Sequence, residues 1–277
     1  MRFDILTIFP EFFADPSGAP TASLAHGVVA RALRSGIASA HTHDLRAFTH
    51  DRHRTVDDRP FGGGEGMVLK PQPIFECAES LNLTPKETRD TTHESVILLS
   101  AQGKRFTQAT ARRLAKLDRI VLICGRYEGV DERINQLYCD MELSIGDYVL
   151  SGGELAAAVV IDAAMRLLPG VLGNEASSEF ESFGIADAEI STEVEGVPRS
   201  QHGAGGLLDY PHYTRPAEFA GLKVPEPLLN GDHQAIRRWR REQQLRKTHA
   251  NRPDLLEQAR QSGALSRKDL EFLEQLR

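Results

Sequence analysis

The 277-residue sequence has only three cysteines, and no apolar run reaches the roughly 20 residues that a membrane-spanning helix needs. Cys77, Cys124 and Cys139 form neither a CxxC pair nor a metal-binding spacing, which argues against a disulfide scaffold and a zinc ribbon. The first residues, MRFDILTIFPEFF, alternate like a strand and lack a signal-peptide cleavage site. We therefore expect reduced thiols, a cytoplasmic location and no membrane partner.

Common nucleotide and hydrolase signatures are also missing. The glycine-rich run GGGEG at 62–66 lacks the Lys-Ser/Thr of a P-loop and does not continue as GxGxxG. Neither a GxSxG elbow nor an HExxH helix occurs. These absences disfavour nucleotide hydrolases, serine hydrolases and zinc peptidases. We interpret the polar loop 50–66 as a flexible loop facing an active site or RNA, and we expect no metal site.

Charge is distributed unevenly along the chain, whose net charge is −6. Residues 233–277 hold eleven Lys and Arg against six Asp and Glu, a balance of +5, so the remainder carries −11. A basic tail on an acidic body is typical of a nucleic-acid contact, although a solvated helical face has the same charge. The single tryptophan, Trp239, lies among arginines and is either a stacking platform for a base or, as is commoner, part of a core.

Predicted strands and helices alternate in the first part of the chain, which indicates an α/β fold with a parallel sheet and helices on both faces. Strands are predicted at 3–9, 37–45, 95–100 and 119–124, and helices at 24–35, 71–83, 107–117 and 154–167. Residues 175–198 then hold seven acidic residues and no basic one, as in a flexible linker. Helices are predicted again at 232–247 and 266–276. We therefore divide the chain into 1–172, a linker at 173–205 and a small helical part at 206–277.

The stretch 121–155 is the most informative, because two apolar segments each end in a glycine-flanked turn with charged residues. The strand ending at Cys124 is followed by Gly125, and a second strand or extended loop at 144–150 is followed by Gly152-Gly153. A third strand is predicted to end in the turn 101–103. Ligands of open α/β folds bind beyond the carboxyl ends of strands, where glycine lets the backbone approach them. The sequence thus predicts one crevice with backbone walls.

Three charged residues near these segments allow two interpretations. Glu128 and Asp131 are each either surface carboxylates in a structural turn or acids of the crevice, and the pooling of strand ends favours the crevice. Arg166 lies within an otherwise apolar helix, where a buried arginine is costly unless it is paired. From the residues alone, a position at the helix rim is favoured over that of a functional cation.

Long motifs cover nearly the whole chain and resemble the bacterial tRNA (guanine-N1)-methyltransferase family of the TrmD type. They are DILTIFPEFF, TVDDRPFGGGEGMVLKPQP, LLSAQGKRFTQ, CGRYEGVDERI, SIGDYVLSGGELAAAVVIDAAMRLLPGVLGNEAS, GLLDYPHYTRP and DHQAIRRWR. The resemblance implies methyl transfer from S-adenosylmethionine to N1 of the guanosine immediately 3′ of the tRNA anticodon. It also implies a homodimer and a SPOUT-type sheet with a C-terminal trefoil knot, which the general avoidance of threaded chains would not have suggested.

The resemblance assigns residues to the three regions. In the catalytic domain, 1–172, it implies a cofactor site made of Leu98, Leu99, Ser100, Gly125, Tyr127, Ile145, Gly146, Asp147, Tyr148, Val149, Leu150, Gly152 and Gly153. Substrate contacts are implied at Glu128, Asp57 and Gly66 and, in the tRNA-binding domain 206–277, at Arg215, Arg237, Arg238 and Arg241. Magnesium is a further candidate cofactor, without an evident set of ligands.

For catalysis, the resemblance implies a cation at guanine O6, Arg166, and a general base in the linker, Glu181, supplied across the dimer interface. Glutamate replaces the family's aspartate there, and a misplacement of about 1 Å can cost on the order of 100-fold in rate. Asp187 and Glu179 are fallback bases. The alternatives are another SPOUT RNA methyltransferase and a catalytically impaired tRNA-binding homologue, which the long linker and Glu181 keep open.

Overall fold

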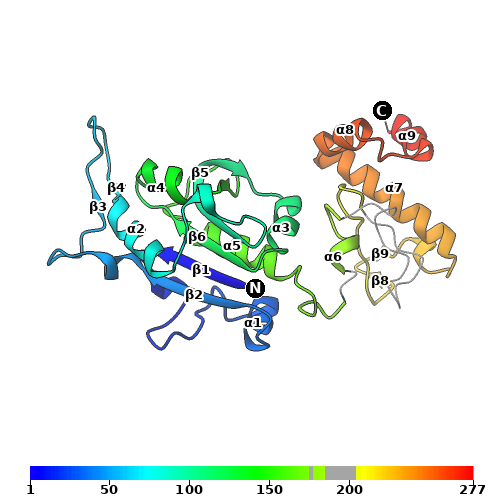
Figure 1. Cartoon of the computed structure of the whole chain (residues 1–277). Coiled ribbons are helices and arrows are strands. Elements are labelled where there is room, and N and C mark those ends of the chain that lie inside the picture. Colours follow the sequence, from blue (N-terminus) through cyan, green and yellow to red (C-terminus); the bar gives the residue numbers. More distant parts are fainter. Residues whose placement is uncertain (175–176, 185–203, 277) are drawn as a thin grey trace. The chain divides into compact units, whose positions relative to one another are not determined.

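The computed structural model describes residues 1–174, 177–184 and 204–276, which form two compact units, Met1–Gly173 and Asn174–Arg277. Unit 1 contains a five-stranded sheet with the strand order β2-β1-β6-β5-β7 (Figure 1). The strands are β1 (Arg2–Thr7), β2 (Ser39–Asp44), β5 (Glu94–Arg105), β6 (Arg119–Cys124) and β7 (Met141–Ser144), and all neighbours are parallel. The predicted α/β class with a parallel sheet is therefore confirmed.

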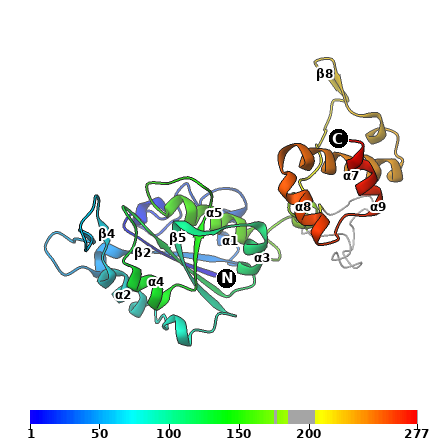
Figure 2. The same ribbon diagram turned by 90° about the horizontal axis from the view of Figure 1, so that it is seen from above.

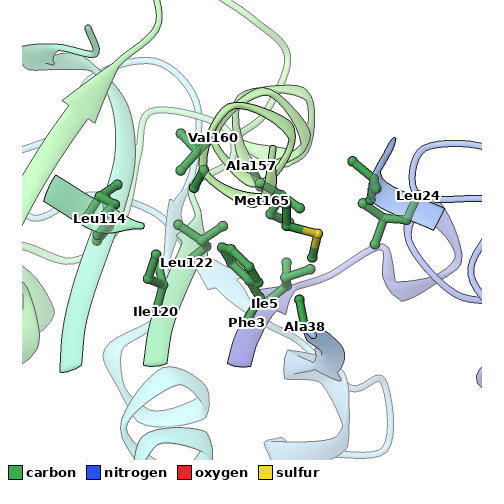
Figure 3. Close-up of a cluster of buried hydrophobic side chains, with 14 of the residues drawn as sticks. Phe3, Ile5, Leu24, Ala38, Leu114, Ile120, Leu122, Ala157, Val160 and Met165 are labelled. Carbon is green, nitrogen blue, oxygen red and sulfur yellow. The ribbon is translucent and has the colours of Figure 1, made fainter. Parts of the chain in front are cut away.

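Alternating side chains of the strands fill two apolar layers, one on each face of the sheet. In β6, Ile120 and Leu122 point to a cluster that includes α1 (Gly27–Arg34), α3 (Gln108–Leu114) and α5 (Glu154–Met165). Val121 and Ile123 point to the opposite cluster, with α2 (Pro71–Ser80) and α4 (Glu132–Tyr138). Figure 2 shows these helices on the two faces, and Figure 3 shows the α5 side of the core. Burial on both faces explains why the strands are continuously apolar.

The glycine-rich loop of unit 1 is closed at its base by a short antiparallel pair, β3 (Asp57–Asp58) with β4 (Val68–Leu69). Three short 3-10 helices complete the unit: η1 (Pro10–Phe12), η2 (Leu45–Phe48) and η3 (Lys86–Thr88). The predicted cap of α3 is confirmed, because the Thr107 hydroxyl accepts a hydrogen bond from the backbone N–H of Thr110.

One prediction along the crevice segments was wrong. The strand predicted at 95–100 does not end in a turn at 101–103 but continues to Arg105, with a register shift against β7 between Leu99 and Lys104. A side chain at Gly103 would lie 2.5 Å from the backbone N of Leu143, so the glycine serves a bulge rather than a chain reversal. Of the two interpretations of 144–150, the loop is confirmed: β7 ends at Ser144, whose hydroxyl donates to the carbonyl of Gly146 and accepts from its N–H.

Unit 2 is smaller and mainly helical. Its elements are α6 (Ser177–Phe180), the hairpin β8 (Glu218–Phe219) and β9 (Leu222–Lys223), η5 (Glu226–Leu228), α7 (His233–Asn251), α8 (Pro253–Gln261) and α9 (Arg267–Glu274). Its buried apolar cluster consists of Leu207, Leu245, Leu256, Ala259 and Leu273. The predicted cap Ser266 is confirmed, since it forms a reciprocal capping box with Asp269. No helix in the described ranges is long and apolar enough to cross a membrane.

Candidate functional site

A crevice of about 510 Å³ lies beside the loops that follow β6 and β7 and the bulged part of β5. Its lining includes every predicted cofactor residue except one: Leu98, Leu99, Ser100, Gly125, Tyr127, Ile145, Gly146, Tyr148, Val149, Leu150, Gly152 and Gly153. Asp147 is the exception, because its side chain is exposed and forms an ion pair with Arg105. The sheet order explains the gathering, since β5 lies between β6 and β7.

The two loops of the crevice touch through their backbones. The N–H of Gly153 donates to the carbonyl of Gly125 at 2.9 Å, and Gly152 forms an isolated bridge with Arg126. A Cβ atom on Gly153 would lie only 2.8 Å from the Cα of Cys124. No side chain fits between loops at this separation, so the glycines are required for the wall itself.

A buried polar network that we did not predict joins these loops to β1. Glu154, at the start of α5, is 1% exposed, and one carboxylate oxygen accepts from the Thr7 hydroxyl at 2.6 Å. The other oxygen pairs with the Arg126 guanidinium at 2.8 Å. Arg126 also donates to the carbonyl of Ser151 at 3.0 Å and stacks on the ring of Phe9 at 4.5 Å. The signal available in the sequence was a charged residue directly after each glycine turn.

The pKa of the neighbouring cysteine, Cys124, is raised in these buried surroundings. Burial, with a smaller contribution from the charge of Glu154, raises the pKa of the Cys124 thiol well above its usual value. The thiols of Cys77 and Cys139 are also buried, and their pKa values rise to about 12. None of the three is poised to act as a nucleophile at neutral pH.

Glu128 lies against the glycine-rich loop. Its backbone N–H donates to the carbonyl of Met67 at 3.0 Å. A Cβ on Gly66 would lie 2.4 Å from a carboxylate oxygen of Glu128, and Gly66 has a φ of 78°, which favours glycine. Two predicted substrate residues that are far apart in sequence are therefore in contact, and Glu128 is an exposed residue lining the crevice.

Asp57, at the base of the same loop, lies beside Tyr127 of the crevice lining. Burial and the neighbouring Asp57 carboxylate raise the pKa of the Tyr127 hydroxyl, so the two side chains lie close together. Tyr127 has a φ of 59°, in the left-handed region that non-glycine residues rarely occupy. Residues in such backbone conformations cluster at functional sites and persist only where surrounding contacts hold them.

The positions of two residues bear on the alternatives given for them. Asp131 caps α4 by accepting from the backbone N–H of Arg133 at 3.0 Å and also pairs with the Arg133 side chain, so it is a structural carboxylate. Arg166 is the half-buried C-cap of α5, at the rim position that the residues favoured. Because α5 begins beside the crevice and rises 1.5 Å per residue, Arg166 lies about 20 Å along the helix from Gly153.

Glu181 lies in unit 2, in the turn that follows α6. Its carbonyl accepts from the N–H of Gly184 at 2.8 Å, and the N–H of Phe183 donates to the carbonyl of Leu207 at 2.8 Å. The turn is thus anchored to the unit's own backbone. Glu179 lies on α6, whereas Asp187 and most of the linker whose flexibility we predict lie outside the described residues.

The predicted tRNA-binding arginines of unit 2 differ in their surroundings. Arg215 and Arg238 are exposed and Arg237 is half-buried. Arg241 is held by two hydrogen bonds to Asp269, at 3.0 and 3.1 Å, which gives it a structural role between α7 and α9. Trp239 is half-buried and lines a cavity rather than the apolar cluster. Within the described residues, no group of three or more His, Cys, Asp or Glu side chains is placed to hold a metal ion.

Comparison with known proteins gives a consistent result. The model of a family described as tRNA (Guanine-1)-methyltransferase TrmD matches residues 1–258. A tRNA (guanine-N(1)-)-methyltransferase of Koribacter versatilis is 56% identical over 277 residues, covering 100% of this chain and 98% of that protein. The proteins of the same name from Heliobacterium modesticaldum and Dictyoglomus turgidum are 49% and 45% identical, over 92% and 100% of this chain and 84% and 97% of theirs.

Proposed function

Because the chain belongs to the TrmD family of tRNA (guanine-N1)-methyltransferases, we propose that it methylates N1 of the guanosine immediately 3′ of the tRNA anticodon. Family membership confirms the resemblance inferred from the motifs. The observation that carries the proposal for this chain is the contact between the crevice and the glycine-rich loop, which puts Glu128 at the edge of the crevice.

The crevice suits S-adenosylmethionine as the methyl donor. Its walls are backbone at Gly125, Gly152 and Gly153, where no side chain separates the peptide N–H and C=O groups from a ligand, and a Cβ at Gly152 or Gly153 would collide with the neighbouring loop. When bound, S-adenosylmethionine would supply an electrophilic methyl group. The predicted cofactor residues that line the crevice would hold it, and Asp147 is not part of this proposal. A magnesium requirement remains a prediction from the family and has no protein ligands assigned to it.

The chemistry of guanine determines the roles of the side chains. N1 of neutral guanine carries a proton and its lone pair is delocalised, so a base must take that proton and a cation should stabilise charge on O6. In the proposal Glu181 accepts the proton, Arg166 faces O6, and Glu128 accepts from the guanine edge, with Asp57 and Gly66 shaping its loop. A nucleobase that lacks the matching N–H donors would leave the Glu128 carboxylate unpaired, which penalises its binding.

A homodimer belongs to the same proposal and is supported by α5. Arg166 is about 15 Å along α5 from Ala156, the last residue of this helix in the crevice lining of its own chain. On this helix Leu155 and Val159, four residues apart, are 53% and 45% exposed and form an apolar stripe. Antiparallel pairing of two α5 helices about a two-fold axis would cover the stripe and bring the partner subunit's Arg166 to this crevice. The SPOUT knot is likewise proposed, supported by the contact of the loops after β6 and β7.

Methyl transfer to two tRNA transcripts tests the function. The transcripts differ only in G or A at the position after the anticodon, and the donor is labelled S-adenosylmethionine. We expect transfer to the G transcript alone. Equal transfer to both would indicate another SPOUT methyltransferase chemistry, and binding of both without transfer would indicate an impaired tRNA-binding homologue.

The role of Glu181 is tested by Glu181→Gln under single-turnover conditions. Loss of the accepting carboxylate should slow methylation by on the order of 100-fold or more, with tRNA binding retained. Glu179→Gln, two residues away on α6, is the matched control and should remain active. A near-normal rate for Glu181→Gln would exclude it as the base, and a loss confined to Glu179→Gln would transfer the role to that residue.

A further inference from the structure

Unit 2 contains a second cavity, of about 410 Å³, that the methyl-transfer reaction does not use. Aromatic and cationic side chains line it together with an apolar floor; among them are Tyr210, His212, Tyr213, Arg215, Trp239 and Arg240. No carboxylate belongs to the lining. The volume falls in the lower part of the roughly 300–1,000 Å³ range of small-ligand pockets, which suits one planar group rather than a folded element.

The side chains of the lining include one pair of aromatic rings and one pair of a ring with a guanidinium group. The rings of Tyr213 and Trp239 meet edge to face with centroids 6.1 Å apart, and Tyr213 is 49% exposed. Behind them Tyr210 is 7% exposed and carries the guanidinium of Arg240 at 4.8 Å from its ring centroid. The inner pair is therefore packed and rigid, whereas the outer pair offers accessible ring surface.

The charged side chains that line the cavity are cationic, and Asp209, a carboxylate outside the lining, pairs with His212 at 2.9 Å. Arg215 lines the cavity and is exposed, and Arg238, the residue before Trp239 on α7, is also exposed. Aromatic surface for a base and guanidinium groups for the attached phosphate are the combination used by proteins that bind single-stranded nucleic acid. An apolar peptide would satisfy the rings but would leave the arginines without partners.

We propose that this cavity binds one unpaired base of the substrate RNA, other than the guanine that is methylated. Tyr213 and Trp239 stack on the base, and Arg215 contacts its phosphate. The inference rests on the proposed function for the identity of the RNA. It adds a second point of recognition, which selects an RNA with an unstacked loop base over a duplex of equal charge.

Trp239 is the only tryptophan of the chain, so its fluorescence reports directly on the cavity. We would titrate the full-length protein with an anticodon stem-loop RNA and with a fully paired duplex of the same number of phosphates. Quenching by the stem-loop but not by the duplex is expected. Equal responses to both RNAs, or no response to a stem-loop that binds, would overturn the proposal.

The contribution of stacking is measured with Tyr213→Ala. Removing one stacking partner should weaken stem-loop binding about tenfold and leave duplex binding unchanged. Tyr213→Phe keeps the ring and should bind like the wild type, which separates stacking from a folding defect. Phe219→Ala, at a 74% exposed aromatic residue of β8 outside the cavity lining, is the control and should have no effect.

Single abasic substitutions in the loop identify the bound base. At one loop position other than the target, an abasic site should weaken RNA binding as much as Tyr213→Ala does. Combining that abasic site with Tyr213→Ala should weaken binding no further, so the two changes are non-additive. Additive losses at every position would overturn the proposal. The two inferences fail separately: methylation with no change in Trp239 fluorescence refutes the cavity, and a fluorescence change without methyl transfer refutes the enzyme function.

Discussion

The crevice of unit 1 differs in its construction from the surface of unit 2 that carries Arg215, Arg238 and Tyr213. In unit 1 the loops after β6 and β7 meet through glycine backbones, and a buried pair, Arg126 with Glu154, holds them. Both faces of the sheet are packed. Unit 2 has a small apolar cluster and presents exposed arginines and half-exposed aromatic rings. Substitutions in the crevice of unit 1 should therefore disturb the positions of the loops and have large effects on stability or ligand binding. Substitutions on the surface of unit 2 should each remove one contact and have smaller effects.

The largest effect is expected for Arg126→Ala. It leaves the carboxylate of Glu154, with a side chain 2% exposed, without its cation, and breaking a buried pair in this way costs about 3 kcal/mol in free energy of unfolding. Urea unfolding followed by far-UV circular dichroism, to which the strands of unit 1 contribute, should move to lower urea. Trp239 fluorescence, which reports on unit 2, should not move.

Arg105→Ala is the matched control for this change. Arg105 and Asp147 form an ion pair in which both side chains are mainly exposed, so its loss should leave unfolding nearly unchanged. An equal shift for both variants would show that the buried pair does not hold the crevice together and would remove the contrast between the two units.

A smaller effect on stability, with loss of ligand binding, is expected for Gly153→Ala. The residue has φ −77° and ψ −8°, which alanine adopts easily, so the cost comes from the Cβ that would lie 2.8 Å from backbone of Cys124. Such overpacking costs about 1–3 kcal/mol. Calorimetry should show S-adenosylmethionine affinity lowered at least about tenfold as the two loops separate.

Gly173→Ala serves as the comparison, because nothing lies within 4 Å of a Cβ at that position. It should bind the methyl donor as the wild type does. If Gly153→Ala also bound normally, the wall between the loops would not be part of the cofactor site.

The smallest effect is expected for Arg238→Ala on unit 2. Arg238 is exposed on α7, and loss of one phosphate contact should weaken tRNA binding a few-fold and reduce the slope of log Kd against log salt by about 1. Arg241→Ala should behave differently, since Arg241 pairs with Asp269: we expect a lower urea midpoint of Trp239 fluorescence and a nearly unchanged salt slope. The reverse pattern would make Arg241 the phosphate contact.

Much of the fold could be predicted because its signals are local. The strand predicted at 119–124 is β6, whose residues alternate between two buried faces, and the caps Thr107 and Ser266 act on residues three positions away. The glycine-flanked turns of the crevice could also be predicted, because glycine next to the end of an apolar strand is a local signal. The bulge at Gly103 was not, because a polar glycine segment resembles a turn until a neighbouring strand passes beside it.

The alternation of strands and helices, the glycine turns, the basic C-terminal part and the family could all be recognised in the order of residues. Which polar side chains meet could not: Arg126 with Glu154, Tyr127 with Asp57, and Arg241 with Asp269. The reason is physical. Secondary structure and caps depend on neighbours along the chain, whereas an ion pair or a close backbone approach depends on which distant segments packing brings into contact.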